Sequence, residues 1–324
     1  MTSTVLILGA AGRIGHVLAA AFAEAGWTVR AQARKDLPAA LSGRGNIVPV
    51  RCDALDAPAL RRAAQGADVI VHALNPVYTE WDRLALPLAD AAINAARSSG
   101  ALLMLPGNVY NFGRELPPVL SPDTPQRGDV PKARIRIEAE ARMAAASGVD
   151  SVVIRAGDFF GGSQPGSWFD LAMTRGLGSG KFVYPGDPAI DHAWAYLPDL
   201  AQTFVRVAER RTQLRGAHRL HFAGHAVTGN AFREALEDVV RKPLRTGGMP
   251  WGFMRIVAPF VPMWREIVTM RYLWQRPHRL DDGALRRLIG SVPHTPLKQA
   301  VAQALTDIHA APSASPSLSA SARA

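Results

Sequence analysis

Residues 4–15 read Thr-Val-Leu-Ile-Leu-Gly-Ala-Ala-Gly-Arg-Ile-Gly, and this stretch decides the fold. The apolar run that ends at Leu8 predicts a buried strand, and residues 17–22 after the glycines predict a helix. Glycine has no side chain and tolerates positive φ, so such a loop can approach a pyrophosphate closely. The helix then directs its free N–H groups and positive dipole end toward that anion. Strand, glycine loop and helix in this order predict a phosphate-binding turn.

The composition is typical of a globular protein. The chain has 324 residues, of which 48% are hydrophobic and 20% charged, which is enough for a full core and predicts a second lobe. One cysteine, Cys52, excludes an internal disulfide framework and a cysteine-based structural zinc site. The alanine-rich N-terminus lacks the basic region of a signal peptide, so we expect a cytoplasmic protein.

The charge balance is strongly basic, with a net charge of +10 and a pI of about 10.4. The basic residues are almost all arginines and are spread along the chain, without a basic arm, a zinc finger or an aromatic-interleaved patch. We therefore interpret them as solvated helix faces and expect no nucleic-acid partner. Such a field would still attract an anionic substrate or cofactor phosphates.

Strands and helices alternate along the first half of the chain. Strands are expected at residues 27–34, 46–51, 67–74, 101–105 and 151–155, and helices at 57–65 (capped by Asp56), 84–98 and 132–147. This alternation predicts βαβ units and a parallel sheet. With right-handed crossovers, the fold class is α/β, a Rossmann-type doubly wound parallel sheet.

The regular alternation of strands and helices ends after residue 157, which predicts a smaller C-terminal substrate lobe. We expect a dinucleotide-binding domain at 1–158 and 187–226, a substrate lobe at 159–186 and 227–311, and a disordered tail at 312–324. A helix is expected at 201–210, with Asp199 near its start. Residues 250–277 are apolar and aromatic, but charges and Pro262 make them too broken for a membrane span. We interpret them as a substrate-lobe or subunit-contact surface, with interfacial membrane contact as the second interpretation.

Several motifs resemble the extended short-chain dehydrogenase/reductase superfamily, which includes the NAD-dependent epimerase/dehydratase proteins. They are the Gly-x-x-Gly-x-x-Gly of residues 9–15, His72-Ala73-Leu74-Asn75, Val109-Tyr110, and the later landmarks at 155–161 and 196–201. The resemblance covers residues 4–210. It implies that a dinucleotide is bound by the following residues: Gly9, Gly12, Arg13, Ile14, Gly15, Ala73, Leu74 and Asn75.

The end of the second strand bears on the choice of cofactor. An acidic residue there would hold a ribose 2′-hydroxyl and repel a 2′-phosphate, but this strand ends Ala33-Arg34-Lys35. Related NADP-binding proteins often place an arginine where Arg13 stands, and a guanidinium suits a phosphate dianion. We therefore favour NADP over NAD, with solvated Arg34 and Lys35 as the alternative. Asp53 resembles the carboxylate that meets adenine in this family, or else it is a turn carboxylate.

The catalytic residues depart from the family pattern of Ser or Thr with Tyr-x-x-x-Lys. Aligning the acidic end of the helix places Lys132 at the tyrosine position and Arg136 at the lysine position, and Pro106 takes the Ser/Thr position. Lys132 is a candidate acid/base, as in some atypical members of the superfamily. Arg136 would hold ribose hydroxyls or a substrate anion, and Asn108 or Tyr110 would polarise a carbonyl. Alternatively, Lys132 and Arg136 are solvated helix residues, and Asn108 and Tyr110 are residues of the core or of the shelf beneath the cofactor.

Two histidines complete the candidates. We expect His72 to be a packed, satisfied side chain on its strand. His192, with Asp187 and Asp191 nearby, hints at a metal or acid/base site, although the spacing is irregular and argues against a metal.

Three functional hypotheses follow. The first is an NADPH-dependent oxidoreductase acting on a small carbonyl or sugar-like substrate. The second is a non-catalytic, NADP(H)-binding redox sensor that resembles the NmrA group, which the missing Tyr-x-x-x-Lys favours. The third is a sugar-nucleotide epimerase, which would ordinarily need the tyrosine. Oligomeric state is left open, with a homodimer as one option.

Overall fold

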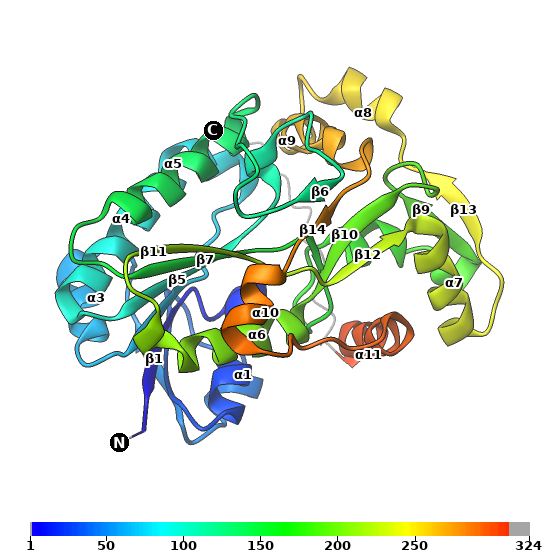
Figure 1. The fold of residues 1–324 in the computed structure, drawn as a ribbon. Coiled ribbons are helices and arrows are strands. Elements are labelled where there is room, and N and C mark those ends of the chain that lie inside the picture. Colours follow the sequence, from blue (N-terminus) through cyan, green and yellow to red (C-terminus); the bar gives the residue numbers. More distant parts are fainter. Residues whose placement is uncertain (1, 311–324) are drawn as a thin grey trace, which may run out of the picture.

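A parallel sheet of seven strands forms the centre of the computed structural model, which describes residues 2–310 (Figure 1). The tail predicted at 312–324 lies outside the described residues. The strands of this sheet are β1 (Thr4–Leu8), β2 (Thr28–Ala33), β3 (Ile47–Arg51), β4 (Val69–His72), β5 (Leu102–Gly107), β7 (Ser151–Arg155) and β11 (Ala217–His221). They lie in the order β11-β7-β5-β4-β1-β2-β3. The Rossmann-type prediction is confirmed, and the strand order reverses between β1 and β4, where such sheets bind ligands.

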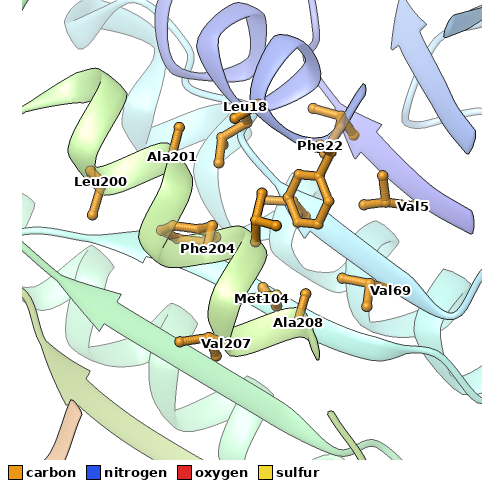
Figure 2. Packing of buried hydrophobic residues seen from close by; sticks show 14 of the residues in the cluster. Val5, Leu18, Phe22, Val69, Met104, Leu200, Ala201, Phe204, Val207 and Ala208 are labelled. Carbon is orange, nitrogen blue, oxygen red and sulfur yellow. The ribbon is translucent and has the colours of Figure 1, made fainter. Parts of the chain in front are cut away.

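Helices cover both faces of this sheet (Figure 1). One face carries α1 (Arg13–Glu24), α6 (Leu197–Glu209) and α10 (Gly283–Ile289), and the other carries α3 (Ala57–Ala64), α4 (Trp81–Ser99) and α5 (Pro131–Ala145). A short α2 (Ala39–Ser42) precedes β3. Figure 2 shows Phe204 of α6 and Phe22 of α1 packed over Val69 and Met104 of the sheet. All four side chains are fully buried, so this layer fixes how α1 sits on β1.

Helix α6 begins four residues earlier than expected, at Leu197. Pro198 stands in its first turn, where its fixed φ favours a helix start and its missing N–H costs nothing. Asp199 therefore lies inside the first turn. Its carboxylate accepts hydrogen bonds from the N–H and the hydroxyl of Thr295, each at 2.7 Å. The side chain thus joins α6 to the segment before α11.

The rest of the chain forms small sheets and helices beside the carboxyl ends of the main strands. One sheet contains β8 (Asp158–Phe160), β10 (Asp191–Tyr196) and β12 (His225–Thr228); β9 (Lys181–Tyr184) pairs with β13 (Arg245–Gly248), and β6 (Val119–Leu120) with β14 (Arg279–Leu280). The helices are α7 (Gly229–Val240), α8 (Trp251–Val257), α9 (Pro262–Thr269) and α11 (Leu297–Ala310). Single turns are η1 (Tyr78–Glu80), η2 (Tyr110–Phe112), η3 (Phe169–Met173), η4 (Leu177–Ser179), η5 (Arg211–Gln213) and η6 (Arg271–Trp274).

This second region has a core of its own, built on aromatic rings. Phe160 of β8 lies in edge contact with Trp194 of β10 and with Phe232 of α7. Strand β10 falls in the range that we assigned to the dinucleotide-binding domain, yet it pairs with β8 and β12. Strand β10 therefore belongs to the small sheet of the second lobe. The rest of our division of the chain stays a prediction.

Pro262 opens a new helix, α9, and so divides the apolar 250–277 segment as its sequence indicates. Among residues 2–310, no helix combines the length and the hydropathy needed to cross a membrane.

Buried histidines should make the folded state sensitive to mild acid. Burial lowers the pKa of His221 and His225 to about 4 and that of His278 to about 3. The unfolded chain binds these protons near pH 6.5, so it holds more protons than the folded chain between pH 6.5 and 4. The contribution of these neutral histidines to the free energy of unfolding is therefore fully present above pH 7. It falls as the pH drops through 6.5, by up to about 1.4 kcal/mol per pH unit for each histidine.

We predict that the free energy of unfolding of His221→Gln falls less steeply as the pH drops, because the variant lacks the slope that about one bound proton contributes. Urea unfolding at pH 7.5, 6.5 and 5.5 measures the slope for both proteins. Equal slopes in the variant and the unaltered chain would contradict a neutral, buried His221.

Candidate functional site

The glycine loop lies at the point where the strand order reverses. Gly9 has φ +80°, and a Cβ on it would lie 3.1 Å from the carbonyl oxygen of Ala73 at the end of β4. A Cβ on Gly15 would overlap the Gly9 carbonyl. Gly12 is the N-cap of α1 without a side-chain cap, and the first turn holds no acidic residue. The free N–H groups of this turn, in a cradle that side chains would fill, fit a pyrophosphate.

The predicted cofactor residues after β4 lie beside this loop. The Ala73 N–H donates to the Leu8 carbonyl at 3.0 Å, and the Leu74 backbone is in contact range of Gly9. Ile14 packs against the core beneath the loop. The structure therefore brings the loop and the end of β4 together, as the sequence predicts.

Gln32 of β2 holds the loop in place and was missed by the sequence reasoning. Its side chain accepts a hydrogen bond from the Gly9 N–H at 2.9 Å and donates to the Cys52 carbonyl at 2.7 Å. The residue is buried, so a polar side chain in an apolar strand was the available signal. Asp53, next in the chain after Cys52, accepts from the Leu55 N–H at 2.9 Å, as a turn carboxylate does.

Arg13 is directed toward the second lobe. Its guanidinium donates to the carbonyls of Phe159 and Gly161, at 3.4 and 3.2 Å, and lies 4.0 Å from Asp170. Burial lowers the pKa of Arg13 to about 10, against the opposing effects of Asp170 and Asp158. The structure thus gives Arg13 a role in joining the loop to the β8 segment, which the sequence reasoning did not foresee.

The chain after β2 carries the other basic residues that we expect to favour NADP. Arg34 and Lys35 are both exposed there. Beside them lies a surface hollow of about 230 Å³, lined in part by Lys35, Ser42 and Arg51. Asp36 also lines it and forms an exposed ion pair with Arg51 at 3.5 Å. Such an exposed pair contributes little to stability, so the Lys35 and Arg51 side chains at the hollow stay accessible to a phosphate.

Asn108 and Tyr110 follow β5 and are held by local hydrogen bonds. The side-chain Oδ1 of Asn108 accepts a hydrogen bond from the Tyr110 N–H at 3.0 Å, and the Tyr110 hydroxyl lies 2.7 Å from that of Tyr78. Burial raises the pKa of Tyr110 well above its ordinary value. Tyr78, which comes from η1 and carries no sequence signal of its own, completes a hydroxyl pair at this end of the sheet.

The inward face of α5 carries three charged residues at helical spacing: Lys132, Arg136 and Glu140. The buried Lys132 ammonium donates to Glu266 of α9 at 2.6 Å and to the Tyr78 carbonyl at 3.1 Å. Glu266 is the only acidic residue in 241–280, and that isolation was a signal which could have identified it. Lys132, which our alignment assigns to the tyrosine position of the family, is thus held in an ion pair.

Arg136 has no such partner within residues 2–310. Its guanidinium lies over the Trp81 ring at 4.8 Å, and its buried Nε has no hydrogen-bond partner there. Burial lowers its pKa, with Glu140 the strongest opposing charge. A cation without a carboxylate partner at this end of the sheet is suited to hold an anion or ribose hydroxyls.

Glu140 instead pairs with the landmark residue Arg155 of β7. The two side chains form a bidentate pair, at 3.3 and 2.5 Å, and the Asn111 amide also donates to Glu140. Gly107 allows this packing, since a Cβ there would lie 2.7 Å from the Arg155 side chain. This fully buried network supports the ends of β5 and β7 beneath the candidate site.

The candidate histidines His72 and His192 lie in different surroundings. His72 is packed but not satisfied, because its buried Nδ1 has no hydrogen-bond partner in the described part of the chain; burial and then the Arg136 charge lower its pKa to about 3. His192 bonds Asp158 at 2.8 Å, not Asp187 or Asp191. Successive strand residues face opposite sides, so Asp191 points away from its neighbour. A search of the described residues finds no cluster suited to a metal ion.

Comparison with known proteins agrees with this geometry. The NmrA-like family matches residues 1–96. A 3-diazoavenalumate denitrifying reductase from Streptomyces sp is 31% identical over 225 residues, which cover 63% of this chain and 72% of that protein. The chain belongs to the atypical short-chain dehydrogenase/reductase superfamily. It is thereby related to NAD(P)-binding proteins of the reductase type.

Solved structures of this superfamily share the fold. MoeE5 in complex with UDP-glucose and NAD has a TM-score of 0.74 at 19% identity, covering 94% of this chain and 98% of its own. UDP-glucuronic acid 4-epimerase from Bacillus cereus, in complex with UDP-glucuronic acid and NAD, has a TM-score of 0.76 at 16% identity, with coverage of 94% and 99%. At these identities the likeness concerns the fold.

The Lys132–Glu266 pair should respond asymmetrically to substitution. Glu266→Gln leaves a buried ammonium without its counter-charge, and we expect a loss of about 3 kcal/mol in the free energy of unfolding. In Lys132→Met the remaining Glu266, whose side chain is 25% exposed, can turn to water, so about 1 kcal/mol is expected. Urea unfolding at pH 7.5 measures both. Equal losses would show that the ammonium is not buried in this pair.

Proposed function

We propose that the chain is an NADPH-dependent reductase acting on a small carbonyl or sugar-like substrate. The observation that carries this proposal is the Lys132–Glu266 pair at the tyrosine position, beside the unpaired Arg136. When bound, a nicotinamide dinucleotide supplies the hydride. The glycine loop fits its pyrophosphate, as the free N–H groups after Gly12 indicate.

Lys132 would serve as the proton donor. As the carbonyl carbon gains a hydride, the carbonyl oxygen takes a proton from the Lys132 Nζ, and the product is an alcohol. The amine left behind regains a proton from solvent through Glu266, which is bonded to it and partly exposed. The Tyr78 carbonyl keeps the Nζ oriented while this happens.

Arg136, Asn108 and Tyr110 would position the reacting groups. The Arg136 Nε–H, which has no hydrogen-bond partner within residues 2–310, would donate to ribose hydroxyls or a substrate anion. Tyr110, with its hydroxyl on Tyr78, would direct a hydrogen bond at the substrate oxygen, and Asn108 holds the Tyr110 backbone in place. Ala73, Leu74 and Asn75 would line the cofactor on the β4 side.

The NADP preference rests on the end of β2. No carboxylate occurs at the end of β2 before Asp36, Arg34 and Lys35 are exposed there, and Lys35 lines the neighbouring hollow together with Arg51 and Asp36. Arg13 faces the β8 segment, so it supports the cofactor loop and not the 2′-phosphate. Asp53 would lie near the adenine.

The prediction is that NADPH binds at least about tenfold more tightly than NADH, and that Arg34→Ala with Lys35→Ala removes this ratio through weaker NADPH binding alone. Nicotinamide fluorescence titration measures both affinities. Arg30→Ala, on the same strand but bonded to the Ala63 carbonyl, is the control and should keep the ratio. Tighter NADH binding by the unaltered chain would overturn the argument.

Turnover tests the reductase itself. A panel of small aldehydes, ketones, sugar derivatives and a diazo compound, with NADPH oxidation as readout, should show at least one substrate. Lys132→Met should then lower kcat by about 10²–10⁴-fold with little change in NADPH affinity. Full turnover in that variant would refute the role of Lys132.

The second candidate is a non-catalytic redox sensor, which the NmrA-like match over residues 1–96 and the missing Tyr-x-x-x-Lys favour. Tight NADPH binding with no turnover on the whole panel would support it. The reductase relative favours catalysis. A sugar-nucleotide epimerase is the third candidate, and it lacks its tyrosine here. The single cysteine, Cys52, fits our inference of a cytoplasmic location.

A further inference from the structure

The α8–α9 hairpin exposes a cluster of large apolar side chains. Phe253, Ile256, Phe260 and Met263 are 58%, 74%, 84% and 39% exposed. They come from eleven consecutive residues, whereas the other large exposed apolar side chains of the described residues lie singly elsewhere. A contiguous exposed patch of this kind marks an interaction surface.

Helix α8 is apolar on both of its sides. Trp251 and Met254 face the protein and are buried, while Phe253 and Ile256 face outward. Its one charged residue is Arg255. A helix that is apolar all round is normally covered, yet α8 lies at the outer margin of the molecule (Figure 1).

The stretch of sequence that contains the hairpin carries almost only positive charges. Residues 241–280 contain eight arginines and lysines and one acidic residue, Glu266, which is engaged by Lys132. Arg255 and Arg265 are exposed on the hairpin itself. The hairpin therefore presents an apolar tip with a cationic rim formed by its two exposed arginines, Arg255 and Arg265.

This charge pattern favours one kind of binding partner for the hairpin over another. A second copy, docked through a two-fold axis, would bring each cationic rim against itself. An anionic lipid surface satisfies both features, because phosphate headgroups pair with arginine and the acyl boundary accepts Phe and Ile side chains. Since no helix of residues 2–310 is suited to cross a membrane, the contact would be interfacial.

We propose that the α8–α9 hairpin docks the protein on anionic membrane surfaces, with Phe253, Ile256 and Phe260 inserted and Arg255 and Arg265 on the headgroups. The hairpin is tied to the candidate site through Glu266 and Lys132, so docking places that site close to the lipid. The proposal does not depend on the reaction, because its test measures binding alone.

Co-flotation of the full chain with vesicles tests it. The unaltered chain should bind vesicles of phosphatidylglycerol with phosphatidylcholine at least about tenfold better than pure phosphatidylcholine. Phe253→Ser with Ile256→Ser and Phe260→Ser should lose this binding. Arg255→Gln with Arg265→Gln should remove the preference for anionic lipid.

The matched control removes three scattered exposed side chains, as Val48→Ser, Val119→Ser and Leu171→Ser, and should bind as the unaltered chain does. Circular dichroism verifies that each variant is folded. Two results overturn the proposal: equal binding to both vesicle types, or no vesicle binding together with a dimer in sedimentation that the hairpin serines dissociate. The second result would assign the surface to a contact between copies.

Discussion

The close approach of the β1–α1 turn to the end of β4 is the constraint on which the rest of the structure depends. Gly9 leaves no room for a side chain beside Ala73, and Gly15 none beside Gly9 itself. Gln32 then fixes the Gly9 N–H from the neighbouring strand. Because the turn is held from both sides, α1 starts with its free N–H groups at the reversal of strand order, which is where this fold binds ligands.

Helix α5 places three charged side chains in three different surroundings. Its inward face carries Lys132, Arg136 and Glu140, and each meets a different environment: a carboxylate from α9, an aromatic ring, and a buried arginine. Within residues 2–310, Lys132 and Glu140 each have a partner of opposite charge and Arg136 has none. A buried cation of this kind favours the binding of an anion beside it.

The parts of the fold that local chemistry dictates were predictable. The glycine loop and the alternation of apolar strands with helices identified six strands of the main sheet but not β11, and Asp56 caps α3 as expected. The site was less predictable, because its partners come from distant segments. Lys132 meets Glu266 across 134 positions of the chain, and His192 meets Asp158 instead of its own neighbours. No periodicity encodes such pairs; they follow from how the second lobe packs on the sheet.

Arg13 has a consequence for the order of events at the site. It belongs to the first turn of α1, yet it donates to the carbonyls of Phe159 and Gly161 in the segment that begins the second lobe. Any ligand that draws on this guanidinium competes with those two hydrogen bonds, and any shift of the segment changes what the guanidinium offers. Such coupling is reciprocal by thermodynamic linkage. The one guanidinium thus ties the first turn of α1 to the segment that begins at β8.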